Sequence, residues 1–152
     1  MNALNTALQQ TQTTTKETIL SLPHQLKAQL PLSTKLAQQI ADQRQTIQNI
    51  LEGKDHRLMI VTGPCSIHDP ISALEYAQKL QQLQSQVSDQ IFLVMRAYIE
   101  KPRTTIGWKG FLYDSNLDNS SNMQLGLEKS RELYLQIIDM GLPIAAEILS
   151  PM

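Results

Sequence analysis

The sequence is short of several residue types and patterns, and each shortage argues against a class of protein. A single cysteine, Cys65, has no partner for an internal disulfide, which agrees with a reducing compartment. No stretch approaches the roughly 18 consecutive apolar residues of a membrane span, and the polar start lacks the apolar centre of a signal peptide. Neither sign of charge dominates, since the net charge is −1 and the pI about 6.3. This balance argues against a nucleic-acid-binding surface. We therefore expect a cytoplasmic protein with no membrane or nucleic-acid partner.

The pattern of apolar residues predicts one α/β domain preceded by a polar arm. Residues 1 to about 18 are rich in Gln, Thr and Asn and cannot bury enough apolar surface to offset their ordering entropy. We therefore expect a flexible extension over residues 1–32 and a folded domain over residues 33–152. Ser33 is placed as the N-cap of a helix that reaches about Glu52, and Gly53 is placed to end it. The strands expected after it are Leu58–Val61, Ile91–Met95 and Pro143–Ile148, and the helices between them start at Pro70, capped by Asp69, and at about Asn122.

This order, a helix followed by β-α-β-α-β, requires parallel strands joined by right-handed helical crossovers. Two architectures satisfy the pattern, a doubly wound sheet and an arc of a (β/α)8 barrel. Helical spacing predicts one inward face for the helix that starts at Pro70. That face consists of Ile71, Leu74, Ala77, Leu80, Leu83 or Gln84, and Val87.

The segment Met95–Gly110, MRAYIEKPRTTIGWKG, concentrates positive charge, with four cationic side chains and one carboxylate. Arg96 directly follows a predicted buried strand, and ligands bind at the carboxyl ends of parallel strands in α/β folds. Pro102 disfavours a regular element, so Lys101 and Arg103 are expected on a loop. Guanidinium and ammonium groups on such a loop suit phosphate and carboxylate ligands. An arbitrary basic loop is more often simply solvated, which is the alternative interpretation.

A second motif, GPCSIHDP at Gly63–Pro70, follows the first predicted strand and so lies at the same end of the sheet as Arg96. A lone cysteine such as Cys65 is more often a small buried apolar residue than a ligand. Taken together, however, the two motifs closely resemble the 3-deoxy-7-phosphoheptulonate (DAHP) synthases of the microbial type. The resemblance runs from about Ser33 to the last residue. It favours the barrel over the doubly wound sheet, and because a (β/α)8 TIM barrel takes about 250 residues, it implies a truncated barrel that forms the front part of a longer protein.

The resemblance assigns expected roles to individual residues. Cys65 matches a ligand of the family's essential divalent metal, and a thiolate ligand favours manganese, iron, cobalt or zinc over magnesium or calcium. The family's other ligands, a His, a Glu and an Asp, come from later strands. Arg96 and Lys101 match positions that hold phosphoenolpyruvate, with Lys101 close to the reacting carbons. The element that binds the phosphate end of erythrose 4-phosphate is matched by Pro102, Arg103 and Thr104.

Two further residues are candidates with equally plain alternatives. His68 lies in the loop that carries the metal ligand, so we expect a catalytic contact with substrate or with the metal's surroundings. The alternative is that His68 simply packs within the loop. Glu147, at the end of the third predicted strand, is expected to face the same rim and to hold a cationic side chain of the site in place. The alternative is a simple ion pair without a role in the site. Trp108 and Lys109 are expected to support the site or a subunit contact rather than to take part in catalysis.

The implied reaction is the condensation of phosphoenolpyruvate with erythrose 4-phosphate and water, the first step of chorismate biosynthesis. The resemblance also implies a homo-oligomer and feedback inhibition by an aromatic amino acid, with the N-terminal extension packed between subunits. The related octulosonate phosphate synthase is disfavoured by the sequence KPRTT. The alternative of another class is a non-catalytic truncated product or an element that joins subunits. We expect the 152-residue chain alone to be marginally stable and inactive.

Overall fold

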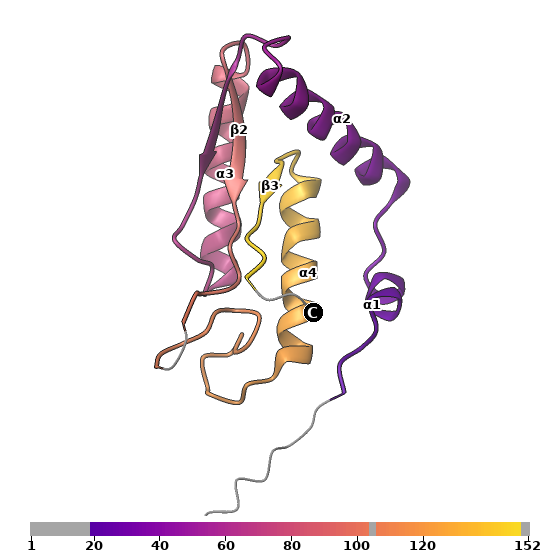
Figure 1. Ribbon diagram of the computed structural model, residues 1–152, viewed down its shortest axis with the longest axis vertical. Helices are drawn as coiled ribbons and strands as arrows, with labels where there is room; N and C mark the ends of the chain where they lie inside the picture. Colours follow the sequence, from indigo (N-terminus) through magenta and orange to yellow (C-terminus); the bar gives the residue numbers. More distant parts are fainter. Residues whose placement is uncertain (1–18, 104–105, 150–152) are drawn as a thin grey trace, which may run out of the picture.

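A computed structural model describes residues 19–103 and 106–149 of the chain (Figure 1). Along these residues helices and strands alternate after two N-terminal helices, as the sequence pattern predicted for the domain. The elements are α1 (Pro23–Gln29), α2 (Thr34–Leu51), β1 (Leu58–Thr62), α3 (Pro70–Val87), β2 (Ile91–Arg96), α4 (Met123–Asp139) and β3 (Ile144–Ala145). No helix in this part of the chain is long and apolar enough to cross a membrane.

The strands form a parallel sheet in the order β1-β2-β3. β1 and β2 pair along their length, from Leu58 opposite Ile91 to Thr62 opposite Met95, and β3 pairs with the end of β2. The predicted parallel α/β arrangement is therefore confirmed. Because β1 and β2 are parallel and pair along their length, their carboxyl ends lie at the same edge of the sheet.

Polar side chains begin the long helices at the positions that the sequence indicated. The Ser33 hydroxyl accepts a hydrogen bond from the Leu36 N–H at 3.2 Å, and the carboxylate of Asp69 accepts from Ile71 and Ser72 at 3.1 Å each. The side chain of Asn122 accepts from the backbone of α4 in the same way. These bonds satisfy N–H groups that have no partner within a helix, and they fix where each crossover helix starts.

The core lies between the sheet and the helices α3 and α4. In Figure 1 α3 lies against β2, and α4 runs beside β3. The main core cluster brings together buried residues of β2, α3 and α4, among them Met95, Ala77, Leu133 and Ile137. Phe92 and Val94 alternate with the core residues of β2 and are also buried, as expected for a strand covered on both faces.

Parts of the structure differ from the sequence-based expectations. Ile71 was placed on the inward face of α3 but is 70% exposed, whereas Ala73 is buried. Of the two alternatives given for one inward position, Leu83 is 45% exposed and Gln84 is half-buried. The buried residues of α3 are Ala73, Ala77 and Leu80, so the inward placement of Ala77 and Leu80 is confirmed. β3 was expected over Pro143–Ile148 but comprises Ile144–Ala145, since only those residues pair with β2.

The segment before the domain contains a helix that the sequence pattern did not predict. α1 lies beside α4 in Figure 1, where Gln124 of α4 accepts a hydrogen bond from the Ser21 N–H and Arg131 donates to the Leu30 carbonyl oxygen. The polar arm expected over residues 1 to about 18 lies outside the described residues. The division into an extension and a domain at residue 32 stays a prediction.

Candidate functional site

The loop after β1 packs directly against the end of β2. A Cβ atom at Gly63 would fall on the carbonyl oxygen and the Cβ of Arg96, so a glycine is needed for this approach. Two residues beyond Cys65, the Ile67 N–H donates a hydrogen bond to the Tyr98 carbonyl oxygen at 2.7 Å. The GPCS loop and the basic segment are thereby held side by side beyond the carboxyl ends of the two strands.

Two cationic side chains converge on Cys65. Nη2 of Arg96 donates a hydrogen bond to the Cys65 carbonyl oxygen at 3.1 Å, and Nζ of Lys101 approaches the Cys65 Sγ at 3.4 Å. The Arg96 guanidinium also stacks on the Tyr98 ring, 4.1 Å from its centroid. Cys65 itself is exposed, so the sulfur is accessible to a ligand.

The cations of the basic segment are not neutralised by described carboxylates. Within the described residues, ion pairs join Lys54 to Glu52 and Arg57 to Asp55, away from this segment. In addition, the buried Nε of Arg96 has no hydrogen-bond partner among the described residues. Positive charge that is held in place without a counter-charge favours the binding of anions.

The basic segment folds back on itself. The Lys101 N–H donates to the Lys109 carbonyl oxygen at 2.9 Å, and the Leu112 N–H donates to the Ile99 carbonyl oxygen at 3.0 Å. Gly110 lies between these bonds with φ +116°, and a Cβ there would lie 2.5 Å from the Ile99 carbonyl oxygen. The close packing that the sequence suggested for the glycines after the charged residues is therefore present.

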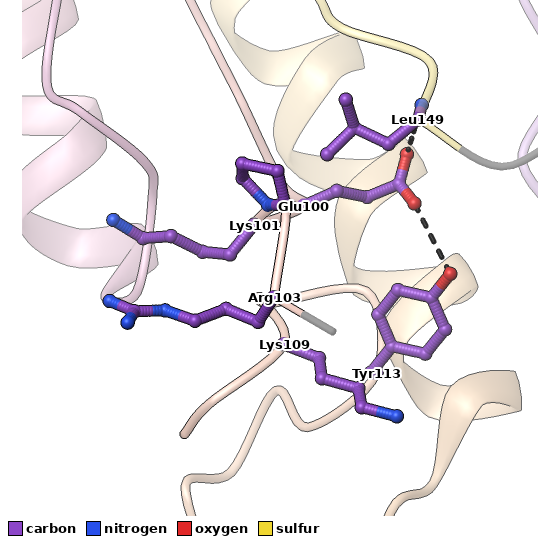
Figure 2. A pocket seen from close by; sticks show the side chains of 7 residues that line it. Glu100, Lys101, Arg103, Lys109, Tyr113 and Leu149 are labelled. Atoms are coloured by element: carbon purple, nitrogen blue, oxygen red, sulfur yellow. Dashed lines mark hydrogen bonds between the residues drawn. The ribbon is translucent and has the colours of Figure 1, made fainter. Parts of the chain in front are cut away.

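A cavity of about 350 Å³ is lined by this folded segment and by the chain after β3. Figure 2 shows the side chains of Lys101 and Arg103 extending together to one side, while Glu100 extends to the opposite side. Lys109 extends toward the side of Tyr113 rather than toward Lys101. The cavity wall consists of Glu100, Lys101, Pro102, Arg103, Lys109, Tyr113 and Leu149.

Other residues that the sequence analysis singled out lie elsewhere. Glu147 lines a separate, mostly apolar cavity of about 520 Å³ and makes no hydrogen bond or ion pair with Arg96 or Lys101. It lies beyond Ala145, where the pairing of β3 with β2 ends. His68 is exposed and lines a third cavity of about 210 Å³ at the start of α3. Thr104 lies outside the described residues.

Cys65 is the candidate metal ligand, and no complete set of ligands surrounds it in the described part of the chain. The exposed thiol of Cys65 suits one position of a metal site, since sulfur is a good ligand for the borderline divalent metals. No cluster of three or more His, Cys, Asp or Glu side chains occurs among the described residues. Cys65 therefore fits a metal as a single ligand, and the described residues do not complete a coordination sphere.

Tyr134 holds the backbone beyond β2 at the base of the site. Its hydroxyl donates a hydrogen bond to the Ala97 carbonyl oxygen at 2.7 Å. Burial and, secondly, the negative charge of Glu100 raise the pKa of Tyr134 well above its ordinary value. The phenol therefore stays a hydrogen-bond donor over the whole physiological pH range.

Two contributions to the site were not recognised from the sequence. Tyr98 was not assigned a role, although its spacing of two residues from Arg96 in an extended segment places both on one side. Glu100 was noted only as the single carboxylate among the cations. A carboxylate kept within a basic stretch is a signal that could have pointed to it.

Comparison with known proteins agrees with this geometry. Residues 29–152 match the model of the DAHP synthetase I family. The Tyr-sensitive phospho-2-dehydro-3-deoxyheptonate aldolase of Escherichia coli (strain K12) is 52% identical over 137 residues, which cover 90% of this chain and 38% of that protein. The Phe-sensitive enzyme of the same strain is 47% identical over 127 residues, covering 84% of this chain and 36% of the relative.

A solved structure extends the similarity to three dimensions. The phospho-2-dehydro-3-deoxyheptonate aldolase from Francisella tularensis SCHU S4 matches with a TM-score of 0.85 at 45% sequence identity, over 89% of this chain and 40% of that chain. The chain thus spans well under half of the length of these relatives. A parallel α/β fold, a cysteine loop packed on a basic segment, and a family match over most of the chain agree with one another. The chain belongs to the DAHP synthetase I family.

Proposed function

We propose that the chain supplies part of the active site of a DAHP synthase. The enzyme would condense phosphoenolpyruvate with D-erythrose 4-phosphate and water to give 3-deoxy-7-phosphoheptulonate and inorganic phosphate. The observation that carries the proposal is the convergence of Arg96 and Lys101 on Cys65, at the carboxyl ends of two adjacent parallel strands. The family match and the names of the relatives support this reaction rather than the octulosonate one.

The residue types suit two phosphorylated substrates. Two anions repel each other, and fixed cations offset that repulsion while they orient the reacting carbons. In this proposal Arg96 and Lys101 hold phosphoenolpyruvate, with the Lys101 ammonium next to the carbon that forms the new bond. Arg103 and Pro102, with Thr104, bind the phosphate end of erythrose 4-phosphate. The side chains of Lys101 and Arg103 extend to the same side of the loop, which supports a shared ligand region.

Cys65 is proposed as one ligand of a divalent manganese, iron, cobalt or zinc ion. When bound, such an ion would supply Lewis-acid polarisation of the aldehyde of erythrose 4-phosphate. The contact of Lys101 with the Cys65 sulfur would keep this cation beside the ligand atom. His68, on the loop that carries Cys65, is proposed to contact substrate or the metal's surroundings. Glu147, in the segment after β3, is proposed to hold a cationic side chain of the site in place.

The wider architecture is part of the same proposal. The β1-α3-β2-α4-β3 unit would be the first part of a (β/α)8 barrel, with residues 33–152 in the barrel domain and residues 1–32 as an extension. The names of the relatives, Tyr-sensitive and Phe-sensitive, support feedback inhibition by an aromatic amino acid. A homo-oligomeric, cytoplasmic enzyme fits this function.

A chimera tests the proposed function. The chain replaces the matching segment of the Tyr-sensitive E. coli relative, and phosphate release is measured with each substrate alone and with both. We expect release only with both substrates. Lys101→Met should lower kcat by about 100-fold or more, the usual effect of removing one preorganised charge from a reacting centre.

The matched control is Lys79→Met, which removes an exposed lysine of α3 and should leave kcat unchanged. A folded chimera without turnover, under conditions in which the E. coli relative is active, would contradict the proposal. Equal effects of Lys101→Met and Lys79→Met would contradict the role of Lys101.

A further inference from the structure

Glu100 is a buried carboxylate in the middle of the basic segment. The residue is only 9% exposed. It forms no ion pair with a described cation, although Lys101 follows it directly in the chain. A buried charged group without a cationic partner is costly unless hydrogen bonds satisfy it.

Two hydrogen bonds satisfy this carboxylate, and they join three separate pieces of chain. Oε1 accepts from the Tyr113 hydroxyl at 3.3 Å, and Oε2 accepts from the Leu149 N–H at 3.4 Å. Figure 2 shows both bonds on the side of the loop opposite to Lys101 and Arg103. Glu100 thereby connects the basic segment to the loop after Gly110 and to the chain that leaves β3.

The backbone on either side of Glu100 is also fixed. The bonds from Lys101 N–H to Lys109 and from Leu112 N–H to Ile99 enclose it. Gly110 packs so closely that a Cβ there would lie 2.7 Å from the Glu100 Cα. Rotation of this stretch about its own axis would break these contacts.

Neighbouring side chains of an extended segment point to opposite sides. Glu100 reaches Tyr113 and Leu149 on one side, and Lys101 reaches the Cys65 sulfur on the other. We propose that Glu100 is a positioning residue, whose two hydrogen bonds hold the basic segment in the orientation that directs the Lys101 ammonium at Cys65. This inference adds a residue to the proposed active site, and its catalytic consequence rests on the proposed function.

Two substitutions separate the hydrogen bonds from the rest of the side chain. Glu100→Ala removes both bonds. Glu100→Gln keeps the length of the side chain, and its amide can accept from the Leu149 N–H while it donates to the Tyr113 oxygen. The glutamine variant should therefore preserve the orientation that the alanine variant loses.

Amide hydrogen exchange of the chimera tests the orientation without any substrate. Glu100→Ala should raise the exchange rates of the Lys101 and Leu112 amides about 10-fold or more, since their bonds depend on the orientation of the segment. The exchange rates of Glu100→Gln should stay close to those of the unmodified chimera. The matched control is Asp114→Ala, which removes another buried carboxylate of the same loop. The Asp114 carboxylate accepts hydrogen bonds from the backbone N–H groups of Asp118 and Asn119. The control should therefore raise the exchange rates of those two amides and leave the Lys101 amide unchanged.

The chimera gives the catalytic readout. Glu100→Ala should lower kcat about 10- to 100-fold in a chimera that still unfolds cooperatively, since a small displacement of a positioned group has effects of this size. Glu100→Gln should restore most of the kcat. A Lys101 amide that exchanges without protection in the unmodified chimera, or at a rate that Glu100→Ala does not change, would overturn the inference. Lowered kcat in Glu100→Ala and Glu100→Gln alike would also overturn it, because the charge rather than the hydrogen bonds would then matter. An inactive chimera would contradict the proposed function, while the exchange rates would still decide the role of Glu100.

Discussion

Replacing Arg96 by lysine tests whether the shape of the guanidinium group, and not only its charge, serves the site. Nη2 of Arg96 donates a hydrogen bond to the Cys65 carbonyl oxygen at 3.1 Å, and the guanidinium carbon lies 4.1 Å from the centroid of the Tyr98 ring. A lysine keeps the positive charge but cannot hold the loop carbonyl and a substrate carboxylate together. A hydrogen bond to a charged group contributes about 1.5–3 kcal/mol. The loss of one such bond should therefore raise the KM for phosphoenolpyruvate by roughly 10- to 150-fold.

The assay is steady-state phosphate release by the chimera, with phosphoenolpyruvate varied at saturating erythrose 4-phosphate. Arg57→Lys is the matched control, since Arg57 also lies over an aromatic ring, that of Phe92 at 5.4 Å, but pairs with Asp55 at the other end of β1. We expect the control to keep its KM. A KM for Arg96→Lys within about twofold of the unmodified chimera would refute the assignment of Arg96 to this substrate.

Two further predictions concern the frame of the site. Leu133→Ala should lower the free energy of unfolding of the chimera by about 2–5 kcal/mol in urea, because Leu133 is 2% exposed in the core. Leu83→Ala should lower it far less, because Leu83 is 45% exposed, and equal losses would contradict the packing of α3 and α4. Hydrogen bonds from the Ser72 hydroxyl, and then from the backbone of Ser72 and Ile71, hold the pKa of Asp69 below its usual 3.8. A lowered folded-state pKa stabilises the fold above the usual pKa, and this stabilisation is lost as the pH falls from there through the folded-state pKa. Asp69→Asn should therefore weaken the fall in melting temperature below about pH 4, and an unchanged pH profile of the melting temperature would contradict this.

The elements that local sequence controls were predictable. Helix starts at Ser33 and Asp69 follow from side chains that accept backbone N–H groups within a few residues, and those bonds are present. β1 and β2 follow from short apolar runs between helical patterns. The meeting of the cysteine loop and Arg96 at one edge follows from parallel pairing, which the order of elements already required.

The features that depend on distant contacts were not predictable. α1 forms a helix where the sequence offers a short polar stretch after Pro23, and the residues that flank it hydrogen-bond to α4, about a hundred residues away. The length of β3 depends on how far its pairing with β2 extends, which its apolar pattern does not encode. The role of Glu100 depends on Tyr113 and Leu149, and nothing local to the basic segment indicates either partner.

Binding of cobalt(II) to the chimera tests most directly whether the Cys65 sulfur and the cations beside it form one site. A cobalt–thiolate bond gives a charge-transfer absorption in the near ultraviolet that oxygen and nitrogen ligands do not give. The absorption should appear in the unmodified chimera, change on addition of phosphoenolpyruvate, and be lost in Cys65→Ser. An absorption that survives Cys65→Ser, or that phosphoenolpyruvate leaves unchanged, would contradict the placement of Cys65, Arg96 and Lys101 at a common metal and substrate site.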